Sequence, residues 1–413
     1  MTYVIIGAGP SGVTAAETLR KADPAGEIVL IGGEPEPPYS RMAIPYLLTG
    51  QIDEAGTYLR KQDGYYDTKR IACTHATVES VDAASKTVRL AGGGAQSYDK
   101  LLVATGASPV RPPVEGLDLP GVHHCWTLAD ARHIIGLARE GADVVLMGAG
   151  FIGCIILESL VERGVKLTVV EALDRMVPRM MNEAAGNMIK DWCTQKGVRV
   201  MTSTKVTKLS QSDGRLAVGL DNGEQTAADL VVVATGVQSN VGFLEGSGVR
   251  IDTGIVVDRH MRSSVEDIYA AGDCAQGLDF STGGWEVHAV QPTAVDHGHI
   301  AALNMAGRPA PFKGSLNMNV LDTAGLVSVS FGRWDGVEGG DHAESIDAGK
   351  FRYTRLEFDG DRIVGALALG RTDHVGVLRG LIQTEIPLGP WKQKLMADPN
   401  RIVEAYIDRT QGV

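Results

Sequence analysis

The chain of 413 residues is long enough for about two or three domains, and its 44% hydrophobic and 22% charged residues are typical of a globular protein. It carries 39 basic residues (Lys and Arg) against 50 acidic residues. The resulting net charge of −11 argues against nucleic acid as a general partner. The five cysteines form no C-x-x-C pair, which argues against a disulfide framework, a zinc site or an iron–sulfur site.

The apolar stretches of the chain indicate no targeting or membrane segment. The first residues lack the charged region of a signal peptide, and the apolar run after them is used by the first predicted strand. The longest apolar stretch, residues 144–157, is broken by glycines and is shorter than the roughly 20 residues that a membrane-spanning helix needs. We therefore expect no membrane insertion and a reduced, cytoplasmic compartment.

A glycine-rich motif stands at the start of the chain, where an apolar β-branched run leads into Gly7-Ala-Gly9-Pro-Ser-Gly12 and a helix-favouring segment. In this context the pattern G-x-G-x-x-G predicts a dinucleotide-binding turn. The first glycine permits the tight turn, the second lets the backbone approach a pyrophosphate, and the third lets the helix pack close to the strand. Glu34 follows the next predicted strand, residues 27–31, at about the spacing of a ribose-binding acid.

A second copy of the motif follows in the middle of the chain. The predicted strand 143–147 leads into Gly148-Ala-Gly150-Phe-Ile-Gly153, and Glu171 ends the next predicted strand at about the expected spacing. Two such motifs in one chain are far less probable by chance than one.

Two apolar runs end in the same tripeptide, Ala-Thr-Gly, at residues 104–106 and 234–236. Each tripeptide follows one of the two glycine motifs along the chain. The sequence therefore predicts an internal duplication of a nucleotide-binding unit.

Glu171 bears on the choice of nicotinamide nucleotide. A carboxylate at this position would accept hydrogen bonds from a ribose 2′-hydroxyl and would repel a 2′-phosphate, so NAD(H) should be preferred over NADP(H). The competing interpretation is that Glu171 only pairs with the nearby Arg175.

Two other segments supply candidates near the first motif. Prolines hold residues 35–50 in an extended loop, where Arg41 and Tyr46 would lie near the ligand of the first motif. The competing interpretation is a surface loop with a solvated arginine. Asp273 ends a short apolar strand, and its carboxylate could meet a ribityl hydroxyl or a phosphate-bound water.

The rest of the chain carries no chemical motif. His297 and His299 face away from each other on a predicted helix, which argues against a metal site. From about residue 314 the pattern changes to alternating strands, at residues 326–331, 351–358 and 363–369, before a helical tail. We expect a separate α+β domain.

Taken together, these residues resemble the flavoproteins with two dinucleotide-binding domains, the pyridine nucleotide–disulfide oxidoreductase superfamily, over the whole chain. The resemblance implies an α/β fold with two Rossmann-like domains, for FAD and for NAD, and a C-terminal α+β interface domain. This last domain is similar to that of NADH:rubredoxin reductases and nitrite-reductase flavin modules. The implied boundaries are residues 1–115 with 242–318 for FAD, 116–241 for NAD and 319–413 for the C-terminal domain.

The resemblance also implies the binding residues of both cofactors. No side chain is expected to be catalytic, because the flavin carries the chemistry. The FAD residues would be Gly7, Ala8, Gly9, Pro10, Ser11, Gly12, Glu34, Arg41, Val78, Ala104, Thr105, Gly106, Asp273, Pro292 and Thr293. The NAD(H) residues would be Gly148, Gly150, Phe151, Ile152, Gly153, Glu171 and Gly236.

The chain departs from the family at the positions that carry thiol chemistry. No two cysteines have the C-x4-C spacing of the disulfide reductases, and Met42 stands where NADH oxidases and coenzyme A disulfide reductases have a redox cysteine. A thioether cannot form a sulfenate, persulfide or mixed disulfide as a thiolate does. Ile155 replaces a frequent family glutamate near the flavin–nicotinamide contact, and the Trp-Ser-Asp-Gln stretch of oxygenase-coupled ferredoxin reductases is absent.

With no thiol relay and no metal, the flavin would be the only redox centre. We therefore expect an FAD-dependent NADH:acceptor oxidoreductase whose partner is an iron–sulfur protein. It would act alone, like a rubredoxin reductase, or as the NAD-reacting subunit of a phenylglyoxylate dehydrogenase-type complex, as an oligomer or hetero-complex. The alternatives are an NADH oxidase that reduces oxygen and a flavin-bound assembly subunit with little turnover. The sequence names neither the acceptor nor the direction of electron flow.

Overall fold

The computed structural model describes residues 1–411, and the chain divides into two compact units. Unit 1 consists of Met1–Ser108 and Val237–Ser315, and unit 2 of Pro109–Gly236 and Leu316–Val413. Each unit therefore combines two segments that are far apart in the sequence. The expected α/β fold class is confirmed by the parallel sheets and helices, whereas the division into three domains stays a prediction.

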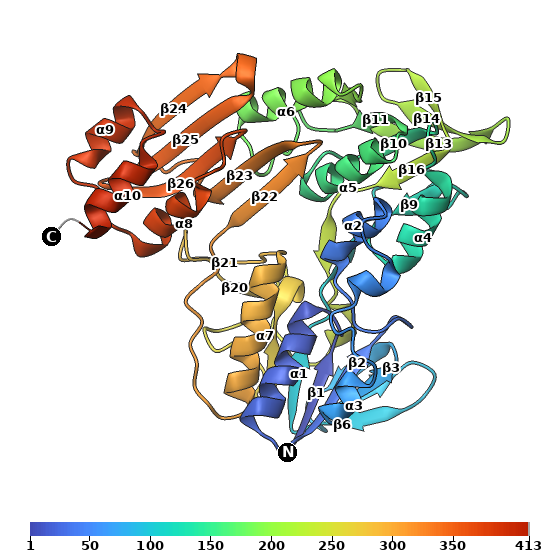
Figure 1. Ribbon diagram of the computed structural model, residues 1–413. Helices are drawn as coiled ribbons and strands as arrows, with labels where there is room; N and C mark the ends of the chain where they lie inside the picture. The colour runs from blue at the N-terminus through green and yellow to red at the C-terminus, as the bar shows by residue number, and fades with distance from the viewer. Residues whose placement is uncertain (412–413) are drawn as a thin grey trace. The chain divides into compact units, whose positions relative to one another are not determined.

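The core of unit 1 is a parallel sheet with the strand order β19-β7-β1-β2-β3. Its central strands are buried apolar runs, as in parallel sheets that are covered on both faces. Helices α1 and α7 lie side by side (Figure 1), and a Cβ atom on Gly298 would lie 2.3 Å from the Ser11 carbonyl oxygen. The elements are β1 (Thr2–Ile6), α1 (Pro10–Ala22), β2 (Glu27–Gly32), β3 (Ile71–His75), β7 (Lys100–Val103), β19 (Ile268–Ala270) and α7 (Gln291–Met305).

Smaller elements complete unit 1. They form the three-stranded sheets β4-β5-β6 and β18-β20-β21, the pair β8-β17 at the ends of its two segments, and two short helices. Their bounds are α2 (Ile44–Leu48), α3 (Tyr65–Thr68), β4 (Val78–Asp82), β5 (Thr87–Leu90), β6 (Ala95–Ser97), β8 (Ala107–Pro109), β17 (Val237–Ser239), β18 (Ile255–Val256), β20 (Ala275–Leu278) and β21 (Trp285–Glu286).

Unit 2 repeats the arrangement of unit 1. Its parallel sheet has the order β12-β11-β10-β16-β9, so β10 lies between β11 and β16 as β1 lies between β2 and β7. Helix α5 follows β10 as α1 follows β1, and the duplication expected from the sequence is therefore present. The elements are β9 (Val122–His124), α4 (Leu128–Leu137), β10 (Asp143–Met147), α5 (Phe151–Glu162), β11 (Lys166–Val170), α6 (Glu183–Gln195), β12 (Arg199–Met201), β13 (Val206–Ser212), β14 (Arg215–Leu220), β15 (Gln225–Ala228) and β16 (Leu230–Val233).

The C-terminal part of unit 2 is an antiparallel sheet with the order β22-β23-β26-β25-β24, followed by three helices. Strand β22 packs against α5, and α8 packs against β23 and β26. The three strands expected from the sequence in this part are present. The bounds are β22 (Met318–Thr323), β23 (Leu326–Gly332), β24 (Asp341–Asp347), β25 (Arg352–Asp359), β26 (Arg362–Leu369), α8 (Val375–Thr384), α9 (Trp391–Ala397) and α10 (Ile402–Gln411).

Within residues 1–411, no helix combines the length and the apolar character needed to cross a bilayer.

Candidate functional site

The first glycine turn joins β1 to α1, and two of its glycines are required by the backbone itself. Gly7 has a φ of +113°, and a Cβ atom there would lie 2.0 Å from the Ala104 carbonyl oxygen. A Cβ atom on Gly12 would lie 1.9 Å from the Gly7 carbonyl oxygen. A side chain at Gly7 would therefore push the turn away from the end of β7, and one at Gly12 would push the start of α1 away from the turn.

Gly9, between these two, is not required by the fold. Its φ of −79° is accessible to any residue, and a Cβ atom there would meet no protein atom within 4 Å. The space beside Gly9 is open, and it lies at the N-terminus of α1, where backbone N–H groups and the helix dipole favour an anion. A glycine without a role in packing, next to open space, fits the close approach of a pyrophosphate.

Two further segments of unit 1 meet this turn. The short turn Gly272–Cys274 lies against it, since a Cβ atom on Gly272 would be 3.3 Å from Ser11 Cβ and 3.5 Å from Ala294 Cβ. The first glycine turn is therefore flanked by Asp273 and by the first residues of α7. Pro292 and Thr293 open that helix, and Thr293 is buried. The structure thus brings the glycine motif together with three site residues expected from distant parts of the chain.

An unpaired hydroxyl and a carboxyl group with a shifted pKa lie at this meeting point. The Ser11 hydroxyl is buried without a hydrogen bond in the described part of the chain. Burial raises the pKa of Asp273 to about 6, while the Arg41 guanidinium acts in the opposite direction. Buried polar groups are nearly always hydrogen-bonded, so these groups fit a ligand that supplies phosphate oxygens and hydroxyls. The residues present therefore fit FAD.

Glu34 is fixed by two neighbours in the proline-rich loop. The Tyr39 hydroxyl donates to Glu34 at 2.6 Å, and the Arg41 guanidinium donates to its other oxygen at 2.6 Å. The Ser40 hydroxyl donates to the Gln291 side chain at 2.7 Å, which ties this loop to the first residue of α7. The interpretation of Arg41 as merely solvated is therefore wrong. Sequence reasoning missed Tyr39, although it stands only five residues after the acid.

Asn240 locks the loop of Thr105 and Gly106. Its amide nitrogen donates to the Thr105 carbonyl oxygen at 3.1 Å, and the Thr105 hydroxyl donates to the Asn240 carbonyl oxygen at 2.7 Å. The Asn240 backbone N–H donates to the Gly106 carbonyl oxygen at 2.9 Å. Asn240 belongs to no motif, so the sequence carried no signal for this role. Val78 begins β4, in a sheet separate from the parallel sheet that carries the glycine turn, and it packs against the core of unit 1.

The second glycine turn, in unit 2, repeats the geometry of the first. Gly148 has a φ of +103°, and a Cβ atom there would lie 2.5 Å from the Ala234 carbonyl oxygen. A Cβ atom on Gly153 would lie 2.3 Å from the Gly148 carbonyl oxygen, whereas one on Gly150 would meet nothing within 4 Å. The open middle glycine again fits a pyrophosphate. Three other residues expected to bind NAD(H) belong to unit 2. Phe151 and Ile152 begin α5, and Gly236 has a φ of +121° and open space beside it.

Glu171 is buried, and its carboxylate holds the backbone around it. One oxygen accepts the Ala149 N–H at 2.6 Å and the other accepts the Leu173 N–H at 2.8 Å. The Arg175 guanidinium pairs with Asp174 at 2.8 Å, so the interpretation of Glu171 as the partner of Arg175 is wrong. A carboxylate offers about four acceptor positions, so capacity for a ribose hydroxyl remains.

The two motif acids are not equivalent in the structure. Glu171 directly follows the last residue of β11. By the strand register, the residue of unit 1 that matches Glu171 is Gly32, at the end of β2, and Glu34 lies two residues later in the chain. The similar sequence spacing therefore hides two different arrangements.

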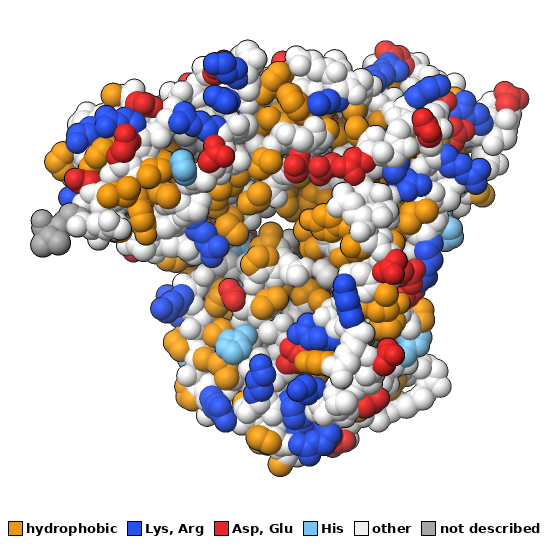
Figure 2. Space-filling model, in the orientation of Figure 1, with side chains coloured by type: hydrophobic (Ala, Val, Ile, Leu, Met, Phe, Trp, Pro, Cys, Tyr) orange, Lys and Arg blue, Asp and Glu red, His pale blue; other side chains and the backbone are white. Residues whose placement is uncertain are grey.

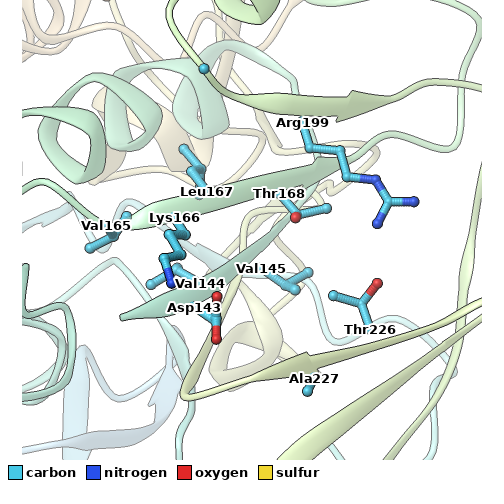
Figure 3. A pocket seen from close by; sticks show the side chains of 11 residues that line it. Asp143, Val144, Val145, Val165, Lys166, Leu167, Thr168, Arg199, Thr226 and Ala227 are labelled. Atoms are coloured by element: carbon cyan, nitrogen blue, oxygen red, sulfur yellow. The ribbon is translucent and has the colours of Figure 1, made fainter. Parts of the chain in front are cut away.

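A cavity of about 300 Å³ lies at the other end of the unit 2 sheet, around Asp143 and Lys166, which begin β10 and β11. Figure 3 shows the side chains that line it. The glycine turn follows the opposite end of β10. Of the charged groups in the cavity, Arg199 pairs with Glu224 and Asp143 pairs with Arg215, each at 2.6 Å. No unsatisfied buried group points to a ligand, and we do not assign one to this cavity.

The five cysteines are all free, and their surroundings disfavour the thiolate. Burial raises the pKa of Cys73 to about 11 and that of Cys125 and Cys193 to about 12. It also raises the pKa of Cys154 and Cys274. Because the thiolate is the reactive form, these raised pKa values disfavour redox chemistry at the five thiols. Residues 1–411 contain no group of three or more His, Cys, Asp or Glu side chains arranged to hold a metal ion.

Comparison with known proteins gives consistent matches. Residues 1–298 match the sequence family described as pyridine nucleotide-disulphide oxidoreductase. The chain is 31% identical over 411 residues to the NADH-dependent phenylglyoxylate dehydrogenase subunit epsilon of Aromatoleum evansii, covering 99% of this chain and 97% of that relative. It is 32% identical over 400 residues to the rhodocoxin reductase of Rhodococcus erythropolis, covering 94% and 91%. The solved structure of a NAD-dependent persulfide reductase from A. fulgidus matches with a TM-score of 0.86 and 29% identity, covering 94% of this chain and 78% of that one.

The geometry of the first turn predicts different fates for two glycine variants. Gly9→Val should fold but lose FAD, because its side chain enters the open space beside the turn rather than protein atoms. Gly12→Val should fail to fold, because no shift of a flexible side chain relieves a 1.9 Å contact with a backbone oxygen. Circular dichroism and the visible flavin spectrum per chain measure both outcomes. A folded Gly9→Val protein with a full complement of FAD would contradict the role of the turn.

The raised thiol pKa values predict that no cysteine takes part in turnover. A variant that lacks Cys73, Cys125, Cys154, Cys193 and Cys274, with alanine at positions 154 and 274 to limit packing damage, should still reduce an artificial one-electron acceptor with NADH. A charge-transfer band between thiolate and oxidised flavin should be absent from the unmodified protein. Loss of acceptor reduction while FAD stays bound would identify a redox-active cysteine.

Proposed function

This chain belongs to the pyridine nucleotide-disulphide oxidoreductase family and is an FAD-dependent oxidoreductase that uses NAD(H), and from this premise we propose that it exchanges electrons between NAD(H) and an iron–sulfur protein. The observation that carries the proposal is the absence of a thiol at the position of the family's redox cysteine. Met42 stands there, 48% exposed, and the pKa values of all five cysteine thiols are raised, which disfavours the thiolate. Electrons that reach the flavin thus have no thiol within the chain to move to, and they need an external acceptor.

The residues assigned to each cofactor follow from the two turns. In unit 1, the first turn with Ser11, Asp273, Pro292 and Thr293 would hold FAD, and Glu34 with Arg41 would hold its ribose end. In unit 2, the second turn with Glu171 would hold NAD(H). The flavin supplies hydride and electron transfer when bound. The protein supplies close backbone approach, helix N-termini and a buried setting.

The names of the relatives support an acceptor outside the chain. One relative is named for the reduction of rhodocoxin, and the phenylglyoxylate dehydrogenase relative is a subunit of an NADH-dependent enzyme. Lys and Arg are interspersed with Asp and Glu on the face drawn in Figure 2, so charge on this face does not define a docking surface. The chain matches the phenylglyoxylate dehydrogenase epsilon subunit over almost its full length. It would act either as a free-standing reductase or as the NAD-reacting subunit of a cytoplasmic complex.

Two alternatives would give different observations. An NADH oxidase would consume NADH steadily with oxygen alone, whereas an assembly subunit would show no reduction of its flavin by NADH.

A direct test is to purify the untagged protein from its source and to analyse the iron content of whatever accompanies it. We expect an iron-containing protein that is reduced by NADH only when this chain is present. A matched control is the Gly9→Val variant, which should still fold but should not support the reduction. Fast NADH oxidation by oxygen, together with no reduction of any iron–sulfur protein, would favour the oxidase instead.

The position of Glu171 predicts the choice between NADH and NADPH. NADH should reduce the flavin much faster than NADPH at equal concentration, because the buried carboxylate repels a 2′-phosphate. Glu171→Ala should narrow the ratio of the two rates, measured by stopped-flow absorbance. If Glu171 only supports the turn, both rates should fall by the same factor and the ratio should stay constant, which would contradict its role in selectivity.

A further inference from the structure

The two glycine turns differ in how the protein holds their second residue. In unit 1, Ala8 makes no hydrogen bond within residues 1–411, and Gly32, which matches Glu171 in register, has no side chain to reach it. In unit 2, Ala149 is buried and both of its backbone polar groups are used. Its N–H donates to Glu171 at 2.6 Å, and its carbonyl oxygen accepts the Val177 N–H at 2.8 Å.

Glu171 is itself fixed on both sides. Its backbone N–H donates to the Met201 carbonyl oxygen at 2.8 Å, and its carbonyl oxygen accepts the Thr204 N–H at 3.0 Å. Its second carboxylate oxygen accepts the Leu173 N–H. The acid is therefore anchored to the ends of β11 and β12 before it reaches the turn. Hydrogen bonds from backbone N–H groups to an ionised carboxylate are among the stronger ones in proteins.

Val177 contacts the turn from the other side in an unusual conformation. It has a φ of +44°, which is an outlier for a β-branched residue, and it is buried. Its carbonyl oxygen accepts the N–H groups of Met180 and Met181 at 2.9 and 3.0 Å, so the segment after it fixes its orientation. This backbone conformation directs its N–H at Ala149. Strain of this kind persists only where surrounding contacts determine it, and it is concentrated at functional sites.

We propose that Glu171 and Val177 form a clamp that holds the second turn in its binding conformation before any nucleotide arrives, whereas the first turn is completed by its nucleotide. This inference rests on the assignment of the second turn to NAD(H). NAD(H) must bind and leave in every catalytic cycle, so a turn that is ordered in advance avoids the ordering cost at each binding event. A cofactor that stays bound needs its turn to be ordered only once. Glu171 and Val177 are thus positioning residues for the nicotinamide nucleotide.

The test measures exchange of the Ala149 and Ala8 amide hydrogens. The FAD-loaded protein without NAD(H) is compared with Glu171→Ala, Glu171→Gln and Asp174→Ala, and the FAD-free protein is included for Ala8. Asp174→Ala is the matched control, because it removes a neighbouring exposed carboxylate that does not bond Ala149. NADH dissociation constants and limiting rates of flavin reduction are measured on the same variants.

We expect Ala149 to be protected without NAD(H), and Ala8 to be protected only with FAD. Glu171→Ala should lose the protection of Ala149 and bind NADH about 10- to 100-fold more weakly, with a smaller effect on the limiting rate and unchanged FAD content. Glu171→Gln, which keeps an acceptor oxygen, should retain most of both properties, and Asp174→Ala should behave like the unmodified protein.

Two outcomes would overturn the clamp: rapid exchange of Ala149 in the unmodified protein, or loss of its protection in Glu171→Ala without weaker NADH binding. If Ala149 is protected as expected but the unmodified protein binds no NADH, the nicotinamide assignment fails instead, and with it the role of the clamp in NAD(H) binding.

Discussion

The structure depends on the close approach of a helix N-terminus to the end of a parallel strand, which occurs once in each unit. At Gly12 and Gly153 the space for a Cβ atom is already taken by the carbonyl oxygen of the first glycine of the same turn, at 1.9 and 2.3 Å. This contact fixes the start of α1 and of α5, and so directs their free N–H groups into the space beside Gly9 and Gly150. The remaining site residues of each unit are arranged around these two helix N-termini.

The two glycine turns share this backbone geometry but differ in how their polar groups are hydrogen-bonded. In unit 1 the Ser11 hydroxyl and the Ala8 peptide make no hydrogen bond within the described residues 1–411. In unit 2 the matching peptide of Ala149 is satisfied by the protein. The peptide at the second position of the turn is thus left open in unit 1 and satisfied in unit 2. Under our proposal, this difference reflects a prosthetic group that stays bound in unit 1 and a nucleotide that exchanges in unit 2.

The sequence predicted most of the fold, because glycine spacing and apolar strands are local features. Both turns, the duplication and the strands of the C-terminal sheet were found where the patterns placed them. The partners of the site residues could not be predicted in the same way. Asn240 reaches Thr105 over more than a hundred residues, and no motif marks it. The pairing of Glu171 with Arg175 was suggested by proximity in the chain, yet the carboxylate bonds the Ala149 backbone, which becomes its neighbour only through the register of β10 and β11.

The central claim is that the flavin is the only redox centre in the chain. The most direct measurement is an anaerobic titration of the FAD-loaded protein with NADH, followed by the flavin absorbance. Because NADH delivers two electrons and the flavin accepts two, we predict complete bleaching after about one NADH per FAD, with no earlier phase that leaves the flavin oxidised. Consumption of about two NADH per FAD would contradict the account, because it would reveal a second two-electron acceptor within the chain.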